Sequence, residues 1–379
     1  MAQANPLFPV KEQFPILDKD TSADIVIIGA GIAGISSAYH LAIKGYKVVV
    51  LEEQEIGAGA TSASSGILYY GTGTDLVDSI NLYGKENAEM LWEESKESIG
   101  LIEKIIEKDN LSCDLRKPGA LIVAKNEEEQ EFLEKELACL KSIGFQGELL
   151  QRDEIKNYYT GKEFLAALKQ DSVIQIAPAL YTVGLAKIAN IEVYNNSPLT
   201  RYKEENNSII VETPKAKIKT QKLLFATNRK PFFGLEKNFF IENSVILASK
   251  KLSEAQIKAI WPEHKIIWTL EDKYDIIYEH DSRAILELYY FKGAKDKIKY
   301  YYENLDFMQE HTWGDSWSKT KDLLPIAGRI KDNVFAAIAM GDQGIVVGFT
   351  VGRKIVDIIE EKSNPFLELI SPKRFGNNI

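Results

Sequence analysis

Residues 24–52 read DIVIIGAGIAGISSAYHLAIKGYKVVVLE and carry the pattern of a strand, a tight turn, a helix and a second strand. The two flanking runs, 24–28 and 47–51, are apolar and rich in β-branched residues, which is typical of buried parallel strands. Between them, residues 32–44 have apolar side chains at helical spacing and end at Gly45, a suitable helix C-cap. This stretch therefore predicts one βαβ unit of a doubly wound α/β domain.

The turn of this unit, GAGIAG, matches the pattern G-x-G-x-x-G directly after a strand and before a helix. The first glycine permits the tight turn, the second lets the backbone approach a pyrophosphate, and the third lets the helix pack closely on the strand. The helix N-terminus adds free N–H groups and the positive end of the helix dipole. The residues predicted to hold a dinucleotide here are Gly29, Gly31, Ile32, Ala33 and Gly34.

An acidic residue, Glu52, follows the second strand. A carboxylate at this place accepts hydrogen bonds from ribose hydroxyls and disfavours a 2′-phosphate, which argues against NADP. For the neighbouring Glu53, a solvated position is the simpler interpretation. The βαβ unit alone leaves NAD and FAD open.

Composition excludes several other classes of protein. The net charge of −9 and the pI near 5.3 argue against general binding to nucleic acid or to anionic membranes. The N-terminal segment has no apolar core of a signal peptide, and the sequence has no run of 18 apolar residues, so we expect no membrane span. The two cysteines, Cys113 and Cys139, form no metal-binding pair and no disulfide framework, which favours a cytoplasmic protein without a metal.

Several segments beyond residue 52 resemble those of one family. The segments are the leader PILDKDTSADIVIIGAGIAG, the loop GATSASSG at 59–66, CDLRKPGALIVAKNEEE from residue 113, LLFATN at 223–228, WGDSWSKTKDLLPIAG at 313–328, and NVFAAIAMGDQGIV at 333–346. In this order they resemble the D-amino-acid-oxidase-like (DAO) superfamily of FAD-dependent oxidoreductases, nearest the branch of γ-glutamylputrescine oxidase, glycine oxidase and sarcosine oxidase. The resemblance covers nearly the whole chain.

The resemblance implies FAD as the cofactor and a second set of contacts to it. The serine-rich loop can satisfy phosphate oxygens and the polar edge of the flavin, and Leu199 is expected on a strand beside the adenine. The turn before the last long helix can stabilise negative charge at the flavin N1–C2=O locus through the helix dipole. The implied contacts are Thr61, Ser62, Ser64, Ser65, Leu199, Ala226, Thr227, Gly341, Gln343, Gly344, Ile345 and Val346. Some relatives bind flavin covalently through a Cys near this turn, and because none lies here we expect non-covalent FAD.

The distribution of signals predicts a discontinuous Rossmann-like FAD-binding domain and an inserted antiparallel-sheet domain, a combination of the α/β and α+β classes. Parallel α/β signals lie at the start, middle and end of the chain, with antiparallel signals between them. The expected FAD-binding domain consists of 1–112, 171–233 and 319–379. The expected substrate-binding domain consists of 113–170 and 234–318.

The implied reaction is transfer of a hydride to the flavin from a C–H next to nitrogen in an amine or amino acid, giving an imine that hydrolyses. Related enzymes that act on amino acids hold the carboxylate with an Arg, and at the equivalent place this chain has Trp317. An amine substrate against an aromatic wall is therefore favoured, although Arg283 and Arg329 are alternative carboxylate clamps. The residues expected to line the substrate pocket are Trp317, Tyr70 and Met340, and further aromatic candidates are Tyr69, Trp313, Tyr278 and Tyr289.

Two alternative functions remain open on sequence grounds. One is a 2-hydroxy-acid dehydrogenase of the same superfamily. The other is a weakly catalytic flavoprotein subunit of a hetero-oligomer, suggested by the missing Arg and a shortened segment at 172–189. The electron acceptor and the oligomeric state also stay open, and no general base is named.

Overall fold

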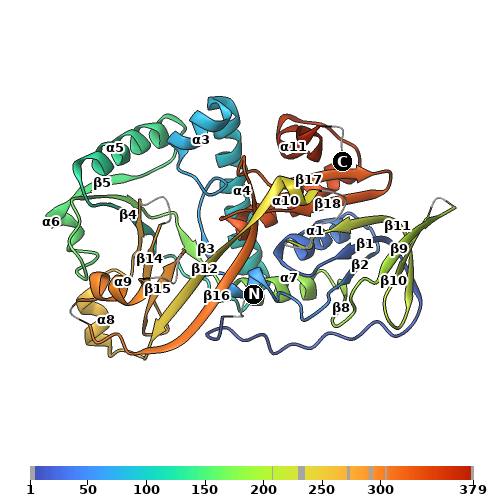
Figure 1. Ribbon diagram of the computed structural model, residues 1–379, viewed down its shortest axis with the longest axis horizontal. Coiled ribbons are helices and arrows are strands. Elements are labelled where there is room, and N and C mark those ends of the chain that lie inside the picture. The colour runs from blue at the N-terminus through green and yellow to red at the C-terminus, as the bar shows by residue number, and fades with distance from the viewer. Residues whose placement is uncertain are drawn as a thin grey trace.

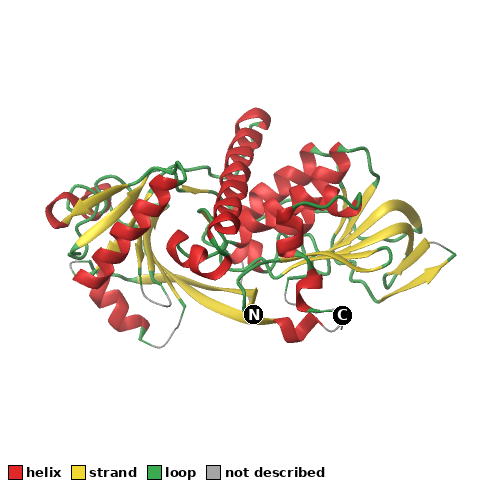
Figure 2. Cartoon of the chain, turned by 90° about the horizontal axis from the view of Figure 1, so that it is seen from above, coloured by secondary structure: helices red, strands yellow, loops and turns green. Residues whose placement is uncertain are grey.

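The computed structural model describes residues 5–206, 208–228, 235–270, 274–289, 293–303 and 305–376. Its main features are two large sheets at opposite ends of an elongated molecule, with helices between them (Figures 1 and 2). The strands β3 (Ile67–Leu68) and β7 (Ile174–Gln175) form a separate antiparallel sheet of two strands. The mixed α/β class with a parallel-rich sheet and a separate antiparallel sheet is confirmed.

The first sheet has five parallel strands in the order β18-β11-β1-β2-β8, which is the expected doubly wound core. The antiparallel strand β17 pairs with β18, and the hairpin β9–β10 pairs with β11. The strands are β1 Thr21–Ile28, β2 Val48–Leu51, β8 Glu192–Tyr194, β9 Arg201–Glu205, β10 Ser208–Glu212, β11 Lys217–Phe225, β17 Ile326–Lys331 and β18 Val334–Ile338.

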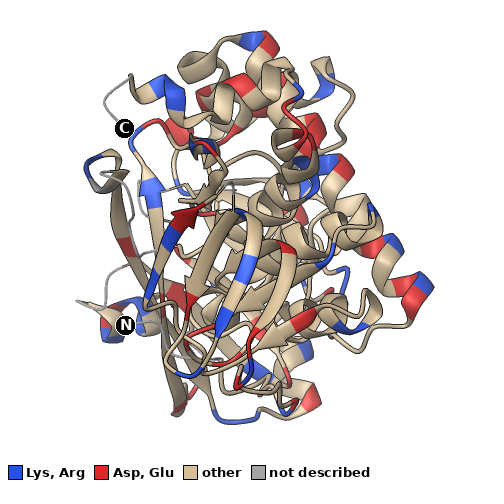
Figure 3. Ribbon diagram, turned by 90° about the vertical axis from the view of Figure 1, so that its right-hand side faces the viewer, with Lys and Arg blue, Asp and Glu red and all other residues tan. Residues whose placement is uncertain are grey.

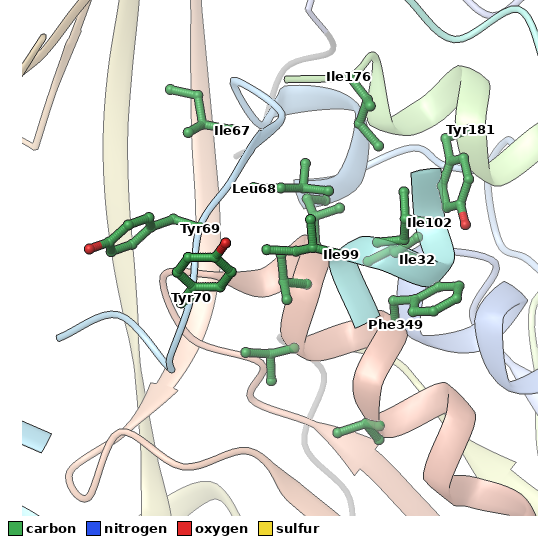
Figure 4. Close-up of a cluster of buried hydrophobic side chains, with 14 of the residues drawn as sticks. Ile32, Ile67, Leu68, Tyr69, Tyr70, Ile99, Ile102, Ile176, Tyr181 and Phe349 are labelled. Carbon is green, nitrogen blue, oxygen red and sulfur yellow. The ribbon is translucent and has the colours of Figure 1, made fainter. Parts of the chain in front are cut away.

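Both faces of this sheet are buried, which explains why residues 25–28 of β1 and all of β2 are apolar at every position rather than at alternate ones. Ile25 and Ile27 of β1 belong to the core under the helices, whereas Val26 and Ile28 pack with the β9–β10 hairpin side. The core of the helical side is continuous across α1, α4 and α10, as Ile32, Ile102 and Phe349 show in Figure 4.

The second sheet has the order β16-β12-β15-β14-β13-β4-β6-β5, and its neighbours are antiparallel except for the parallel pair β13–β4. Its strands are β4 Ala120–Ala124, β5 Glu148–Gln151, β6 Ala166–Gln170, β12 Phe239–Ser249, β13 Ile266–Thr269, β14 Ile276–His280, β15 Arg283–Leu288 and β16 Gln309–Thr320. The strand β16 is the long central arrow that runs toward the first sheet in Figure 1. Its C-terminal end therefore brings the second sheet into contact with the first.

The described helices surround these sheets. They are α1 Ile32–Ile43, α2 Ala60–Ala63, α3 Leu76–Tyr83, α4 Lys85–Asp109, α5 Glu127–Ser142, α6 Arg152–Ile155, α7 Pro178–Ile188, α8 Glu254–Ile260, α9 Ala294–Tyr301, α10 Gly344–Ile359 and α11 Pro365–Ile370, with 3₁₀ turns at Leu235–Asn238 and Pro372–Phe375. No helix in the described part of the chain is both long enough and apolar enough to cross a membrane. Acidic and basic residues are interspersed over the elements seen in Figure 3.

Helices α3 and α4 follow each other directly but remain separate, because Gly84 between them has φ +78°, a backbone conformation that a right-handed helix cannot include. One detail of the sequence interpretation is corrected. Leu199, expected on a strand, lies in the irregular segment between β8 and β9. That segment passes over the end of the first sheet, so the side chain still reaches the cleft described below.

Helices α1 and α10 pack unusually close together, although their sequences lie more than 300 residues apart. A Cβ added at Gly352 would lie 2.5 Å from Ser36 Cβ, and one at Gly348 would lie 3.0 Å from Ile32 Cγ2. Glycine is required at these two positions because any side chain would separate the helices. The close approach places the two helix N-termini beside one another at the same end of the sheet.

Candidate cofactor and substrate site

A cleft with a cavity of about 270 Å³ opens at the carboxyl ends of the five parallel strands. Each strand contributes the residues that follow it, as expected for a ligand site in a doubly wound sheet. The contributing residues after β1, β2, β8, β11 and β18 include Gly29, Gly31, Glu52, Pro198, Leu199, Ala226, Thr227, Met340 and Gly341.

The three glycines of the first turn occupy different surroundings. Gly29 has φ +105°, and a Cβ there would lie 2.5 Å from Ala226 O, so only glycine fits the turn. A Cβ at Gly34 would lie 1.9 Å from Gly29 O, which confirms that this glycine is needed for helix packing rather than for ligand contact. Gly31 lines the cleft with its backbone and is the N-cap of α1, where it provides no capping side chain. The N-terminus of α1 thus faces the cleft, where its dipole favours an anionic ligand.

The serine-rich loop forms α2 and closes one wall of the cleft. Thr61 Oγ1 accepts a hydrogen bond of 3.0 Å from Ile32 N, so this hydroxyl lies at the N-terminus of α1. Ser64 and Ser65 also line the cleft. Ser62 does not line it: its hydroxyl donates to Gly59 O, and its carbonyl accepts from Asn5 N. Successive residues of a helix point in different directions, so Ser62 points away from the cleft that Thr61 lines.

Glu52 lines the cleft and also supports the glycine turn. Its Oε2 accepts from Ala30 N at 2.8 Å, and its Oε1 accepts from Gln54 N at 2.9 Å. Burial raises the pKa of this carboxyl, and the two backbone N–H groups partly offset that effect. The side chain thus fixes the loops on either side of the position where a ribose is expected.

The turn before α10 provides the opposite end of the cleft. Gly341 has φ +70°, and α10 begins at Gly344 after the N-cap Gln343 with no side-chain cap. Gly341, Gln343, Gly344 and Ile345 line the cleft. Val346 does not, because it is fully buried in the core on the other side of the helix.

Hydrogen bonds of Ser318 fasten strand β16 to this end of the cleft. Ser318 N donates to Asn228 Oδ1 at 3.1 Å, Ser318 Oγ donates to Asn228 O at 2.9 Å, and Gly341 N donates to Ser318 O at 3.1 Å. Asn228 has φ +48°, so it adopts the left-handed conformation that Asn tolerates. These bonds hold the neighbouring Trp317 over the end of the parallel sheet.

An aromatic chamber from the second sheet covers this end of the cleft. Trp317 Nε1 donates to Asp342 Oδ1 at 2.8 Å, and its ring meets that of Tyr289 edge to face at 5.6 Å. Tyr289 Oη in turn donates to Tyr274 Oη at 2.6 Å. The chamber residues that line the cleft are Trp268, Tyr274, Ile276, Glu287, Tyr289, Asp315 and Trp317, with Met340 beneath them.

Glu287 on β15 is a functional candidate that the sequence interpretation missed. It belongs to a cross-strand row whose other members are apolar, and only 8% of the residue is exposed. Its Oε1 accepts from Ser244 Oγ at 3.0 Å, whereas its Oε2 has no hydrogen-bond partner. Burial raises the pKa of this carboxyl, and the hydroxyls of Ser244 and Ser65 partly offset the effect. The row is Ile122, Trp268, Ile276, Glu287, Ile246 and Trp313.

Other expected substrate contacts lie elsewhere. Tyr70 is wrong as a pocket residue, because its ring packs edge to face against Phe145 at 4.7 Å and the residue lines neither cavity. Arg283 donates to Ser249 O and pairs with Glu310, and Arg329 pairs with Glu361. Neither guanidinium lines the cleft, and the described lining residues include no Lys, Arg or His.

Two further aromatic candidates, Trp313 and Tyr278, are core residues. Trp313 Nε1 donates to Ala63 O at 3.0 Å and so fixes the serine-rich loop to the second sheet. Tyr278 is 3% exposed and lies outside the residues that line either cavity.

A second cavity of about 610 Å³, here called the outer cavity, adjoins the aromatic chamber. The two spaces share Trp268, Tyr274, Tyr289, Asp342 and Gln343. The other side chains around the outer cavity come mainly from the loop before α3, from the start of α5 and from β12. It is thus an extension of the cleft away from the parallel sheet.

The residues that line the cleft can be compared with the chemical groups of FAD, which are a pyrophosphate, a ribose, an adenine and a flavin ring. The N-termini of α1 and α10, whose N-cap residues provide no capping side chain, open into one cleft, where they suit anionic groups. Gly31 lines the cleft, and the side chain nearest to it is the small hydroxyl of Thr61, 3.2 Å from where a Cβ would lie. Glu52 lies at the end of β2 beside Leu199, where a ribose and an adenine are expected. The residues present therefore fit FAD.

Comparison with known proteins agrees with this fit. The family model described as FAD dependent oxidoreductase (DAO) matches residues 24–358. The chain is 25% identical to the probable oxidoreductase OrdL of Haemophilus influenzae over 97% of this chain and 90% of that protein. It is also 25% identical to the γ-glutamylputrescine oxidoreductase of Escherichia coli over 96% of this chain and 89% of that protein.

Solved structures show the same fold at low sequence identity. The L-amino acid deaminase of Proteus myxofaciens has a TM-score of 0.77 with 15% identity, covering 100% of this chain and 98% of that one. The glycine oxidase of Geobacillus kaustophilus has a TM-score of 0.74 with 16% identity, covering 92% of this chain and 98% of that one.

Proposed function

Because the chain belongs to the DAO family of FAD-dependent oxidoreductases, we propose that it oxidises a C–N bond of an amine. The bound flavin supplies the redox chemistry by accepting a hydride from the carbon next to nitrogen. The amine also loses a proton, and the resulting imine hydrolyses to a carbonyl compound and the released amine. The residues of this chain must hold the substrate, remove its ammonium proton and exclude water.

The observation that carries the proposal is the buried carboxylate of Glu287 in the aromatic chamber. A carboxylate in an apolar row with one unpartnered oxygen is costly unless a cation or a proton completes it. The described lining residues offer no cation, so an ammonium group of the substrate is the partner that the site requires. A substrate carboxylate would instead be repelled by Glu287 and Asp315.

The chamber residues act on the substrate before and during oxidation. The raised pKa of Glu287 suits it to accept the ammonium proton, so that the nitrogen becomes neutral. The faces of Trp317 and Tyr289 attract a cationic amine and keep water out. Asp342, which accepts from Trp317 Nε1, holds that ring in place.

We further propose that FAD is bound without a covalent link. This is supported by the positions of Cys113 and Cys139, which line neither cavity. In this binding mode Glu52 would hold the ribose, α1 the pyrophosphate, and α10 the flavin. Acid precipitation of the holoprotein is expected to leave all the yellow colour in solution, and flavin that stays on the precipitated chain would contradict the proposal.

The domain limits and the cellular location also remain proposals. We propose that 1–112, 171–233 and 319–379 form the FAD-binding domain and that 113–170 and 234–318 form the substrate domain. The division is supported by the sheets, since β4–β6 and β12–β15 all belong to the second one. The unpaired state of Cys113 and Cys139 supports a cytoplasmic location.

An anaerobic substrate screen tests the proposed reaction. The oxidised holoprotein is mixed with primary and secondary amines, with α-amino acids and with 2-hydroxy acids, and flavin absorbance is followed. Amines are expected to bleach the flavin faster than amino acids of equal chain length. Bleaching by 2-hydroxy acids alone would identify a hydroxy-acid dehydrogenase, and no bleaching by any of these compounds would support a weakly catalytic subunit.

A further inference from the structure

The outer cavity is an acidic space that the reaction at the flavin does not require. We propose that it binds a second cationic nitrogen of the substrate, so that the substrate is a diamine or polyamine. This inference rests on the proposed amine oxidation. It adds a recognition site for the end of the substrate that is not oxidised.

The charge around the outer cavity is strongly one-sided. Its only basic side chain among the described residues is Lys319, and this ammonium is already paired with Asp342. The carboxylates that line it are Asp75, Asp78, Glu128, Glu129, Glu242 and Asp342. Such a cavity attracts a cation and repels a substrate tail that carries a carboxylate.

Among these carboxyl groups, that of Asp75 is not used to cap the helix that it begins. It is the N-cap residue of α3, yet its side chain makes no capping hydrogen bond. The two N–H groups at the start of α3 are taken instead by Glu136, whose oxygens accept from Leu76 N at 2.8 Å and Val77 N at 2.9 Å. The carboxyl of Asp75 is therefore left to the cavity that it lines. Burial and the neighbouring Glu136 raise its pKa, so an ammonium group that binds there would replace its proton.

A second observation independently indicates a polar ligand. Tyr69 lines the outer cavity and is 6% exposed. Its hydroxyl makes no well-formed hydrogen bond, although the equally unsatisfied Gln170 side chain lies beside it and partly offsets the effect of burial, which raises the pKa of Tyr69. Figure 4 shows this hydroxyl pointing away from the Ile99 and Ile102 part of the core. A phenol oxygen accepts a hydrogen bond from an ammonium group, and leaving it unpartnered in a buried position costs stability.

The aromatic wall between the two spaces suits the carbon chain of such a substrate. The Trp268 ring lies 5.6 Å from that of Tyr69 on one side, and Trp268 shares the cross-strand row of Glu287 on the other. An alkyl spacer can therefore lie against Trp268 and Tyr274 while one nitrogen meets Glu287 and the other meets Asp75. Apolar contact along the spacer and charge at both ends would give selectivity for length.

Matched ligands test the inference. Binding of hexylamine, 1,6-diaminohexane and 6-aminohexanoate to the oxidised holoprotein is measured by calorimetry, with a series of diamines of other lengths. The diamine is expected to bind at least tenfold more tightly than the monoamine, and the amino acid more weakly than both. Equal affinities for the diamine and the monoamine would overturn the inference.

The two proposals can fail separately. If monoamines and diamines reduce the flavin at equal rates and bind equally well, amine oxidation stands and the outer cavity has no role. If no amine reduces the flavin, the proposed function fails. The calorimetric comparison still decides whether the outer cavity binds a second cation, since it does not depend on turnover.

Substitutions in the outer cavity test whether its residues cause the preference for a diamine over a monoamine. Tyr69→Phe and Asp75→Asn are each expected to lower the ratio of diamine to monoamine affinity by about tenfold, because each removes one polar partner of the remote cation. The control Asp153→Asn removes an exposed carboxylate of α6 that lines neither cavity, and it should leave the ratio unchanged. Flavin content and circular dichroism report folding, and an unchanged ratio in both folded cavity variants would overturn the assignment.

Discussion

Replacement of Glu287 by Gln should weaken amine binding without weakening the fold. An ammonium nitrogen about 4 Å from the carboxylate gains roughly 4 kcal/mol at the effective dielectric constant of protein sites. A neutral amide can keep one hydrogen bond to the same nitrogen, worth about 1 kcal/mol. The net loss of about 3 kcal/mol corresponds to an increase in Kd of roughly 150-fold.

The effect on stability should depend on pH with a definite sign. The pKa of Glu287 is raised by burial, so between its unfolded and folded pKa values the folded protein binds more protons than the unfolded chain. At low pH the carboxyl is protonated in both states, and the folded state bears no cost of burying a charge. As pH rises through the folded pKa, the buried carboxyl ionises and the free energy of unfolding falls. The Glu287→Gln variant lacks this loss, so its midpoint of thermal unfolding relative to wild type should rise with pH.

The assay combines anaerobic stopped-flow reduction of the flavin by a monoamine with thermal unfolding at pH 5 and pH 8. Glu212→Gln is a matched control, because Glu212 lies on β10, pairs with Arg201 and does not line the cleft. Wild-type affinity for the amine in the Glu287→Gln variant at pH 8, where the carboxyl is more ionised than at pH 5, would refute the role assigned to this carboxylate.

Three other predictions concern the cofactor site and the outer cavity. Gly352→Ala should cost about 1–3 kcal/mol and lower both the unfolding midpoint and the retention of FAD, because its Cβ would lie 2.5 Å from Ser36 Cβ; Gly100→Ala, with open space at its Cβ, should not. Glu52→Ala leaves two backbone N–H groups without their partner and should weaken FAD by about 2 kcal/mol, roughly 30-fold in Kd, measured by flavin fluorescence on dilution. Burial, with a nearby carboxylate, raises the pKa of Asp75 to about 8, so wild-type stability should fall as pH rises from about 4 toward 8. Asp75→Asn should therefore unfold at a higher temperature than wild type at pH 8.5 and at the same temperature near pH 4, and a constant difference across this range would contradict the assignment.

Local patterns in the sequence predict the parallel half of the molecule well. The glycines of residues 29–34 serve both turn geometry and helix packing, and these constraints act within a few residues of one another. The apolar runs of β1 and β2 follow from burial on both faces of the sheet. Glu52 follows the end of β2 and accepts a hydrogen bond from Ala30 N. Asn228 follows the end of β11 and adopts a left-handed conformation that Asn tolerates.

The substrate side depends on long-range pairing that the sequence does not display. Glu287 becomes conspicuous only when five neighbouring strands place apolar residues beside it, although the single acid within the buried run RAILEL was a usable signal. Strand β16 is too polar to be recognised by alternation, yet it holds Trp317 over the cleft. Tyr70 was misplaced because successive residues after β3 diverge, so that Tyr69 reaches the outer cavity and Tyr70 packs on Phe145.

The contact between α1 and α10 has a consequence for how the protein is made. A growing chain displays the glycine turn after its first few dozen residues, but the facing helix is synthesised roughly 300 residues later. Until α10 has emerged and docked through Gly352, the nascent chain has only half of the surface that encloses FAD. Cofactor capture should therefore be a post-translational event, and ribosome-bound chains that end before residue 344 should emerge without flavin however long they are held.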